Sequence, residues 1–362
     1  MSGGVDSSVA AYLLKQQGYE VIGAHMRLWF REEDEALYEQ NSQGCCSLAA
    51  ASDAEKVAYR IGIPFYVLNF KQKFHQRIVK SFISEYLKGR TPNPCIDCNR
   101  FIKWEEFLKR AQELGCEYIS TGHYARIKFD ASSNRYLLYK GLDKTKDQTY
   151  MLSHLNQTQL ARTLFPLGIY KKDQVREMAE KIGLNVANKP ESQEICFIPN
   201  NDYGEFLNSQ APEKIQPGPI YDMEGNFIAN HKGICFYTIG QRKGLGIALG
   251  KPVYVIDIDY ANNALIIGEK KHLYFEGLLA EDLNFIPFRY PNQELEVETK
   301  IRYNSPAVAS ILIPLAEQNT AKVKFFERMP AVTPGQGVTF YRGDLVIGGG
   351  IIKDKLKSSD RG

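Results

Sequence analysis

The stretch that decides the fold is Ser2-Gly3-Gly4-Val5-Asp6-Ser7-Ser8, at the start of the chain. It runs directly into an apolar segment with the spacing of an amphipathic helix, Val9, Ala10, Leu13 and Leu14. Glycines let a backbone approach an anion closely, and the free N–H groups and the dipole of a helix N-terminus favour negative charge. The serines add hydroxyl donors. The stretch therefore predicts a phosphate-binding loop, although a strand-to-helix turn without a ligand would have the same pattern.

The bulk composition limits the classes of protein that fit. A chain of 362 residues exceeds one typical domain, and a formal charge of +3 is too small to indicate a nucleic-acid partner by itself. No apolar run is long enough to cross a bilayer, and the first residues do not resemble a signal peptide. Seven cysteines without regular spacing indicate thiols and not a disulfide framework. These features predict a cytoplasmic location.

The first half of the chain alternates between helical and extended patterns. Strands are expected at 21–26, 64–70 and 118–121, and helices at 54–61, 74–87 and 101–114. Alternation of this kind predicts a mostly parallel sheet covered on both faces. A phosphate loop in such a fold normally follows a buried strand, so we expect a further strand upstream of Ser2.

The second half has a different pattern. Two hairpins are expected, at 221–228 and at 253–267, followed by short strands at 296–302, 308–315, 322–326, 338–341 and 345–351. Evenly spaced strands with turn signals predict a small barrel or sandwich. We place the domains at 1–205, 206–275 and 276–355, with a polar tail at 356–362.

Cys95-Ile96-Asp97-Cys98 follows Thr91-Pro92-Asn93-Pro94, so both cysteines are expected in a stiff loop between two helices. Cys196 lies far away in the sequence. Three roles remain open for these cysteines. A zinc site would need a fourth ligand at compatible spacing, packing thiols would be buried, and reactive thiols would lie near the phosphate loop. Cys116 and Cys235, in apolar stretches, are expected to be packing thiols.

The motifs together resemble a known family. Ser2–Ser8 is similar to the pyrophosphatase (PP) loop of the N-type ATP-pyrophosphatases. Further along, the order of motifs resembles the bacterial tRNA-specific 2-thiouridylases over essentially the whole chain. These motifs are Thr91–Cys98, Ser120-Thr121-Gly122-His123-Tyr124, Lys146-Asp147-Gln148, Ile195-Cys196-Phe197 and Tyr237–Gly246.

This resemblance implies an α/β fold with a parallel-sheet adenine-nucleotide α-hydrolase-like (PP-loop) domain, a small β-rich central domain and a C-terminal β-barrel. It also implies ATP with Mg²⁺ as the activating nucleotide. The residues implied to bind ATP are Ser2, Gly3, Gly4, Val5, Asp6, Ser7, Ser8, Met26 and Gly122. ATP would adenylate O2 of the wobble uridine, which turns that oxygen into part of a good leaving group.

The sulfur chemistry is implied by the same resemblance. Cys196 corresponds to the persulfide carrier, loaded by a cysteine desulfurase or a relay protein, and Cys98 to the nucleophile. A Cys98–Cys196 disulfide would remain after turnover. The substrates would be tRNAs with anticodons for Lys, Glu and Gln.

Contacts with the tRNA follow from the motifs as well. Asn93, Pro94 and Cys95 correspond to the segment that touches the target base. The positions that correspond to tRNA contacts are His123, Lys146, Asp147, Gln148, Arg302, Tyr303 and Gln336. Extrusion of the base from its stack would be needed for it to reach a buried thiol. Lys146, Arg302 and the Arg242-Lys243 pair can contact phosphates.

One departure from the family pattern opens an alternative. Many members have Asp where this chain has Cys95, and Cys95, Cys98 and Cys196 could instead hold an iron–sulfur cluster with one open iron. Two other functions fit parts of the pattern: a C–N-forming ATP-pyrophosphatase, which needs no cysteine pair, and a non-catalytic tRNA-binding protein.

Overall fold

The computed structural model describes residues 1–28, 48–184, 186, 195–198, 202–247, 249–315 and 319–356. The chain forms two compact units. The first comprises Met1–Val79, Cys95–Asn201 and Asp344–Val346, and the second comprises Lys80–Pro94, Asp202–Gly343 and Ile347–Gly362. The predicted domain boundaries at residues 205 and 275 stay a prediction.

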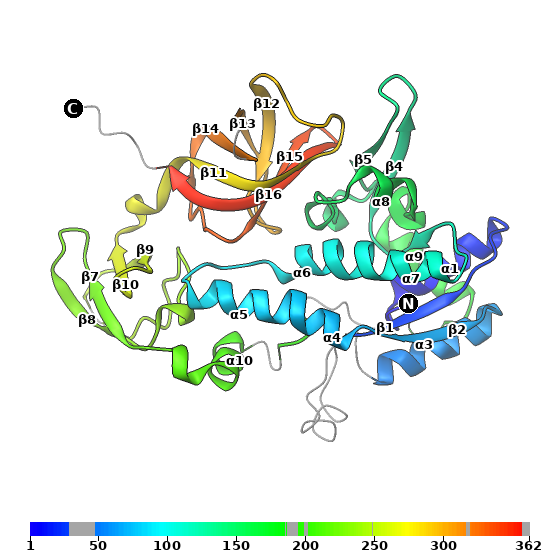
Figure 1. Cartoon of the computed structure of the whole chain (residues 1–362), viewed down its shortest axis with the longest axis horizontal. Helices are drawn as coiled ribbons and strands as arrows, with labels where there is room; N and C mark the ends of the chain where they lie inside the picture. The colour runs from blue at the N-terminus through cyan, green and yellow to red at the C-terminus, as the bar shows by residue number, and fades with distance from the viewer. Residues whose placement is uncertain are drawn as a thin grey trace. The chain divides into compact units, whose positions relative to one another are not determined.

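The first unit contains the predicted parallel strands. Strand β1 (Gly23–Arg27) pairs with β2 (Phe65–Asn69), and β3 (Ile119–Ser120) pairs with β6 (Thr163–Leu164), in both cases parallel. The α/β class with parallel strands is therefore confirmed (Figure 1). The helical segments of this unit are α1 (Val5–Gln16), α3 (Leu48–Ile61), α4 (Lys71–Phe74), η2 (His75–Val79), α6 (Pro94–Asp97), η3 (Cys98–Phe107), α7 (Leu108–Glu113), η4 (Lys144–Lys146), η5 (Thr149–Met151), α8 (Gln157–Ala161), η6 (Pro166–Ile169) and α9 (Lys172–Lys181).

Helix α1 lies at the centre of this unit's core. Its apolar face, including Val5 and Val9, packs with α3 and α9. Val175 and Ala179 of α9 are fully buried in the same cluster. Burying one such side chain contributes about 1.5–3 kcal/mol for residues of valine size. The core therefore holds the N-terminus of α1 in a defined place.

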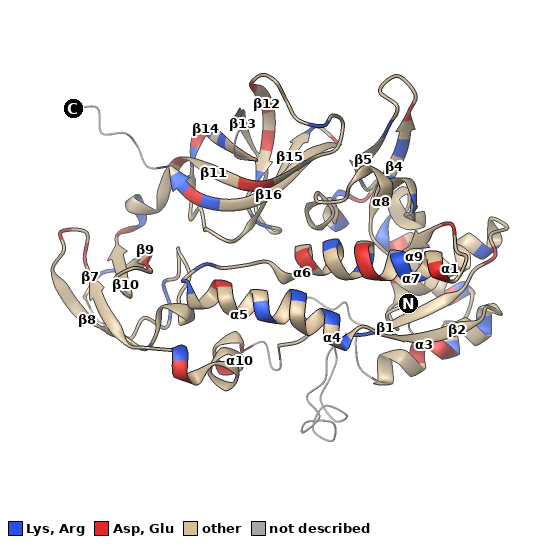
Figure 2. Ribbon diagram, in the orientation of Figure 1, with Lys and Arg blue, Asp and Glu red and all other residues tan. Residues whose placement is uncertain are grey.

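The segment around the Cys-x-x-Cys pair differs from the prediction. Cys95 and Cys98 were expected in a loop, but Pro94 begins helix α6 and Cys98 begins the wider, π-type helix η3. Proline favours the first helical position because its missing N–H has no partner there in any helix. The loop thus ends at Asn93. Basic and acidic residues both occur along η3 and α7 (Figure 2). Arg77 of η2 pairs with Glu105 at an N–O distance of 3.0 Å, and Arg110 pairs with Glu113 at 2.9 Å.

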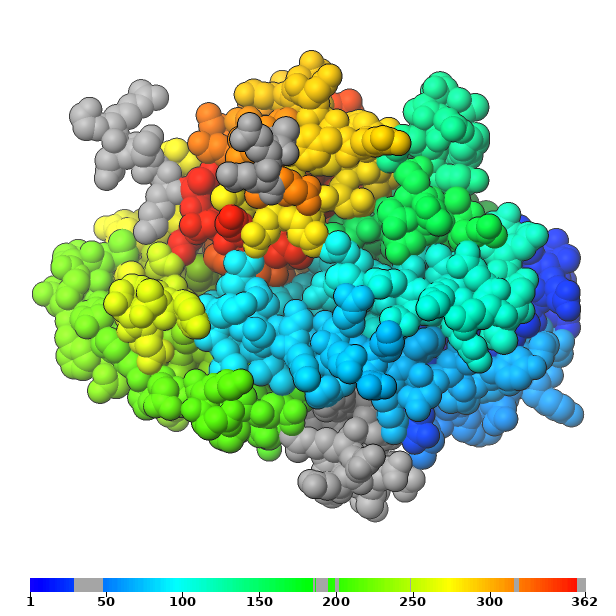
Figure 3. Space-filling model, viewed as in Figure 1, coloured from blue at the N-terminus to red at the C-terminus, as the bar shows by residue number. Residues whose placement is uncertain are grey.

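A hairpin in the first unit was not predicted. Strands β4 (Ala125–Asp130) and β5 (Arg135–Lys140) pair antiparallel and stand out from the surface (Figure 3). The turn depends on local polar contacts, because the Asp130 carboxylate accepts from the Ser133 N–H at 3.1 Å and Asn134 adopts a φ of 51°. Asparagine tolerates this left-handed conformation better than most residues.

The second unit begins with helix α5 (Lys80–Leu87) and contains both predicted hairpins. The sheet order is β8-β7-β10-β9, and Leu265, Val255 and Ile220 are fully buried at its centre. The elements of this region are α10 (Tyr203–Gln210), η8 (Pro212–Lys214), β7 (Gly218–Tyr221), β8 (Phe227–His231), η9 (Ile234–Phe236), β9 (Tyr254–Asp259), β10 (Ala264–Gly268) and η10 (Lys270–Leu273).

The last part of the chain forms the predicted barrel. Within the described residues the strand order is β11-β14-β13-β12-β15-β16, and pairing of β11 with β16 closes it. Closure removes the exposed strand edges that an open sheet would leave. Residues 357–362 of the predicted tail lie outside the described residues. The strands are β11 (Tyr274–Phe285), β12 (Leu295–Lys300), β13 (Val308–Leu315), β14 (Thr320–Pro330), β15 (Gly337–Arg342) and β16 (Leu345–Leu356).

Replacement of Leu265 with Ala should destabilise the hairpin sheet of the second unit. Because Leu265 is fully buried among Ile220 and Val255, we expect the free energy of unfolding to fall by about 2–5 kcal/mol in urea titrations. Tyr260, which is 60% exposed in the β9–β10 turn, gives the matched control. Its replacement with Ala should change that free energy by about 0.5 kcal/mol or less. Equal effects of the two substitutions would contradict this assignment of the core.

Candidate nucleotide and thiol site

The predicted phosphate loop lies at the N-terminus of α1. Gly4 precedes the helix with an extended backbone, and no side chain of the described residues caps the first N–H groups. The hydroxyl groups of Ser7 and Ser8 donate to the carbonyl of Gly4 at 3.2 and 2.8 Å, and the N–H of Ser2 donates to the Ser7 hydroxyl at 3.1 Å. These bonds fold the loop around the helix end, where backbone N–H groups can face an anion.

Two glycines are required for this arrangement. Gly3 has a φ of +70°, and a Cβ there would lie 2.4 Å from the carbonyl oxygen of Ala50. A Cβ on Gly122 would lie 2.7 Å from the backbone nitrogen of Ser7. Gly122 therefore packs directly against the first turn of α1, as the prediction of a shared ATP site requires. Met26, the other predicted ATP residue outside the loop, lies near the end of β1 opposite Leu68 of β2.

Asp6 has two partners from distant parts of the chain. The Tyr124 hydroxyl donates to its Oδ1 at 2.8 Å, and Nζ of Lys172 lies 2.8 Å from both carboxylate oxygens. Tyr124 and Lys172 are buried. Lys172 was not among the predicted site residues. A signal was available, because a lysine at the first position of a helix opposes the helix dipole.

Cys98 is half-buried and Cys95 is exposed, at the start of the α6–η3 helix. The neighbouring Asn99 is buried and its side-chain amide donates to the carbonyl of Met151 at 3.0 Å. Further along, the indole N–H of Trp104 donates to the Thr163 hydroxyl at 2.7 Å. These bonds fix the helix that carries the two thiols.

Cys196 is half-buried and, like Cys98, belongs to the first unit. Its neighbour Phe197 packs edge-to-face on Phe74 of α4, with ring centroids 5.6 Å apart. The predicted closeness of Cys98 and Cys196 to one another, and their disulfide after turnover, stay predictions.

Among the described residues, no group of three His, Cys, Asp or Glu side chains is arranged to hold a metal ion. The iron–sulfur cluster on Cys95, Cys98 and Cys196 stays a hypothesis. Cys235, by contrast, behaves as the packing thiol that was predicted, since burial raises its pKa to about 11.

His123 lies beside the loop residues. Its ring packs against Trp104 and Phe165, with centroid separations of 5.6 and 6.1 Å, and Nδ1 lies 2.7 Å from the Thr121 hydroxyl. Burial, and after it the charge of Lys103, hold the pKa of His123 well below its usual 6.5. The imidazole is therefore neutral at physiological pH.

The Lys146–Gln148 segment reaches the same place. Gln148 Oε1 accepts from the backbone N–H of Tyr124 at 3.1 Å, and Asp147 accepts from the Thr149 hydroxyl at 2.8 Å. Gln148 is thus hydrogen-bonded to Tyr124, the residue that follows His123 in the chain. The structure therefore brings the segments around Gly122 and Gln148 to the loop, as the shared-site prediction requires.

In the second unit, the predicted tRNA residues come together from three segments. The guanidinium of Arg302 donates to the carbonyl of Ala331 at 2.9 Å and to the Thr333 hydroxyl at 2.6 Å. The N–H of Thr91 donates to the carbonyl of Pro334 at 2.9 Å. The segment that precedes Asn93 therefore runs beside the 331–336 turn, which contains Gln336. Nζ of Lys300 lies over the ring of Tyr303, 5.5 Å from the ring centroid.

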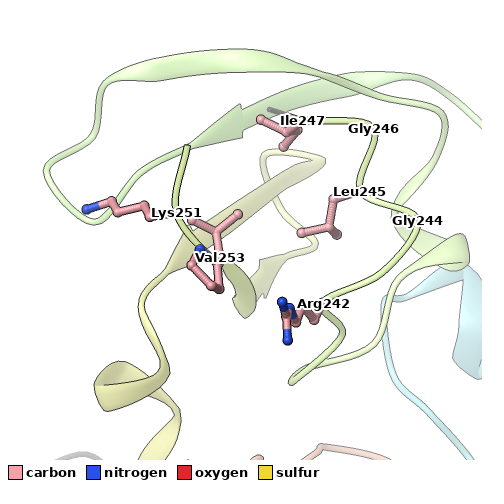
Figure 4. Close-up of a pocket in the computed structure, with 8 residues that line it drawn as sticks. Arg242, Gly244, Leu245, Gly246, Ile247, Lys251 and Val253 are labelled. Carbon is pink, nitrogen blue, oxygen red and sulfur yellow. The ribbon is translucent and has the colours of Figure 1, made fainter. Parts of the chain in front are cut away.

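A shallow pocket of about 410 Å³ lies on the Tyr237–Gly246 motif, in the second unit (Figure 4). The residues lining it are Arg242, Gly244, Leu245, Gly246, Ile247, Lys251, Pro252 and Val253. Arg242 and Lys243 are exposed. Lys251 is paired with Glu269 at 2.8 Å. Among the described residues, Arg242 forms no ion pair, so its charge is available for an anion.

The fold and the loop define a HUP-class protein with two further β-rich regions. Residues 1–200 match the model described as the tRNA methyl transferase HUP domain. Residues 204–269 match its PRC-barrel domain, and residues 275–352 match the aminomethyltransferase beta-barrel domain. Among the described residues, no helix has both the length and the apolar composition needed to cross a membrane.

Relatives make the family explicit. The chain is 67% identical over 352 residues to the tRNA-specific 2-thiouridylase MnmA of Natranaerobius thermophilus, covering 97% of this chain and 95% of the relative. It is 53% identical over 357 residues to MnmA 2 of Caldanaerobacter subterraneus subsp. tengcongensis, covering 99% and 97%. The chain belongs to the tRNA-specific 2-thiouridylase family.

A weaker similarity exists to a solved structure. The U34-tRNA thiolase NcsA from Methanococcus maripaludis, with its 4Fe–4S cluster, is 18% identical, with a TM-score of 0.34. The match covers 59% of this chain and 65% of that one. A similarity at this level does not extend to ligands.

The two loop glycines allow a direct test of the loop geometry. Gly3→Ala should lower the free energy of unfolding by about 2 kcal/mol or more, because its φ is positive and a Cβ meets backbone. Gly4→Ala should cost about 1 kcal/mol or less, since the nearest atom to its Cβ would be Ser2 Oγ at 3.6 Å. Urea unfolding of both variants measures the difference. Equal costs would show that the loop has another conformation.

His123 predicts an acid sensitivity. Below its ordinary pKa of 6.5 the unfolded chain binds a proton that the folded chain excludes, so stability is lost as the pH falls. Between pH 6.5 and 5 this loss is at most about 2 kcal/mol. It should be absent in His123→Gln, measured by urea unfolding at both pH values. An unchanged pH dependence in that variant would mean that His123 takes up its proton normally.

Proposed function

We propose that this chain is an ATP-dependent tRNA-uridine 2-sulfurtransferase, which converts the wobble uridine to 2-thiouridine. The observation that carries this proposal is the 67% identity over nearly the whole length of a tRNA-specific 2-thiouridylase. The loop at the start of α1 supports it independently, because its glycines and free N–H groups suit a polyphosphate. We also propose domain boundaries near residues 205 and 275.

The first step is adenylation of the uridine. The uridine O2 attacks the α-phosphorus of ATP, and pyrophosphate leaves together with its Mg²⁺. Residues Ser2–Ser8 hold the phosphates, with Met26 and Gly122 beside the nucleotide. Charge that develops on the pyrophosphate is stabilised by the N–H groups at the start of α1.

The second step delivers sulfur. Cys196 carries a persulfide supplied by a cysteine desulfurase or a relay protein, and Cys98 is the nucleophile. Either Cys98 attacks the inner sulfur and the released sulfide attacks C2, or the persulfide attacks C2 and Cys98 then cleaves the S–S bond. In both orders the C2–O2 bond breaks, and AMP leaves with that oxygen as part of its phosphate. A Cys98–Cys196 disulfide remains, to be reduced by an external thiol before the next cycle.

The positions of the thiols support these roles. Cys98 lies one turn into a helix whose N-terminal dipole favours a thiolate, and its helix is anchored by Asn99 and Trp104. Cys95 is more exposed than Cys98 and, with Asn93 and Pro94, lies where the chain enters the helix. We assign these three residues to contact with the extruded base.

The tRNA partners are those with anticodons for Lys, Glu and Gln. His123, Lys146, Asp147 and Gln148 contact the tRNA near the nucleotide loop, and Arg302, Tyr303 and Gln336 contact it from the second unit. Arg242 and Lys243 add phosphate contacts beside the pocket of Figure 4. A neutral, ring-stacked His123 is suited to hydrogen bonding and stacking with a base.

The cysteines give the decisive test. Cells lacking the gene are complemented with variants, and tRNA nucleosides are quantified by mass spectrometry. Cys98→Ser and Cys196→Ser should each reduce 2-thiouridine by more than about 100-fold, since loss of a catalytic nucleophile costs several orders of magnitude. Cys116→Ser, at another half-buried cysteine, is the matched control and should retain the modification.

Each failure of this test has a different meaning. If loss of the gene leaves 2-thiouridine unchanged and Cys98→Ser still forms AMP and pyrophosphate from ATP, a C–N-forming ATP-pyrophosphatase would be favoured. Absence of AMP and pyrophosphate formation from ATP and tRNA would indicate a non-catalytic tRNA-binding protein. If activity in anaerobic preparations requires iron, an iron–sulfur cluster would be indicated instead of the persulfide route.

A further inference from the structure

Lys172 is a buried lysine that forms an ion pair with Asp6 of the nucleotide loop. Its side chain is 7% exposed, and Nζ lies 2.8 Å from each carboxylate oxygen of Asp6. Lysine is rarely buried to this extent without a partner of opposite charge. The ammonium also lies over the ring of Tyr124, 5.9 Å from its centroid, and the Tyr124 hydroxyl donates to the same carboxylate.

The fold holds this lysine rigidly. Lys172 is the first residue of α9, where Asp143 accepts its backbone N–H at 3.0 Å and Gln174 accepts the N–H of Lys171 at 2.8 Å. Val175, in the next turn, is fully buried against α1. The position is unfavourable for a cation with respect to the α9 dipole. Because a lysine is disfavoured at this position of its own helix, its presence there indicates a role outside that helix.

The role of Lys172 follows from the position and charge of Asp6. It lies in the first turn of α1, among the N–H groups that we assign to the phosphates of ATP. A carboxylate beside a polyphosphate repels it unless the carboxylate's charge is compensated. Lys172 supplies the compensating charge and holds both oxygens of Asp6, and Tyr124 holds one of them.

We propose that Lys172 is a positioning residue for ATP: it neutralises and orients Asp6, so that the N–H groups at the start of α1 can receive the phosphates. The inference rests on the proposed function, because it presumes that the loop binds ATP. It adds Lys172, Tyr124 and the α9 N-terminus to the machinery of the first step.

The test is binding of Mg·ATP to the full-length protein without tRNA, measured by calorimetry, together with the KM for ATP and for tRNA. Lys172→Met should raise the dissociation constant and the KM for ATP at least tenfold, because Asp6 is left uncompensated. The KM for tRNA should change less than twofold. Adding Asp6→Asn to Lys172→Met should recover at least threefold of the loss, since it removes the charge that Lys172 compensates.

Lys181→Met is the matched control, because it removes an exposed lysine from the other end of the same helix and should bind ATP as the wild type does. If Lys172→Met does not fold, Tyr124→Phe and Lys172→Arg replace it, with two- to fivefold weaker ATP binding expected for each.

Three results would overturn the inference: unchanged ATP binding in a folded Lys172→Met, unchanged binding in both replacement variants, or a double variant that binds more weakly than Lys172→Met. The last would mean that the Asp6 carboxylate itself is needed by the ligand. A wild-type protein that does not bind Mg·ATP would instead refute the proposed function.

Discussion

The structure of the first unit depends on the close packing around the first turn of α1. On one side of this turn, the carbonyl of Ala50 occupies the space that a Cβ at Gly3 would need. On another side, Gly122 lies against the backbone of Asp6 and Ser7. Neither position can hold a Cβ without displacement of backbone. A loop held in this way presents its N–H groups without further rearrangement, which is the condition for tight binding of an anion at a helix end.

The same turn connects parts of the chain that are far apart. Through Asp6 it is joined to Tyr124 after β3 and to Lys172 at the start of α9, and through Tyr124 to Gln148. The segments that the family resemblance assigned to ATP and to tRNA near position 123 therefore share one hydrogen-bonded network. Adenylation and recognition of the tRNA substrate are both assigned to groups within it.

The order of elements could be predicted well from local patterns. Strands β1 and β2, the two hairpins of the second unit and the barrel strands were expected near their observed places, because each is a short periodic run bounded by turn residues. The Cys-x-x-Cys segment was placed in a loop because two prolines precede it. Proline forbids a helix interior but favours its first position, so Pro94 begins a helix in the structure.

By itself, the sequence determined the class of fold, and it predicted the phosphate loop and the two thiols, because these depend on residue types at fixed local spacing. Only the tertiary structure decided what surrounds the loop. The partner of Asp6 is a lysine 166 residues away, buried by the packing of α9 on α1. Local periodicity carries no information on such a pair, since its geometry arises from the burial of apolar faces of helices that are distant in the chain.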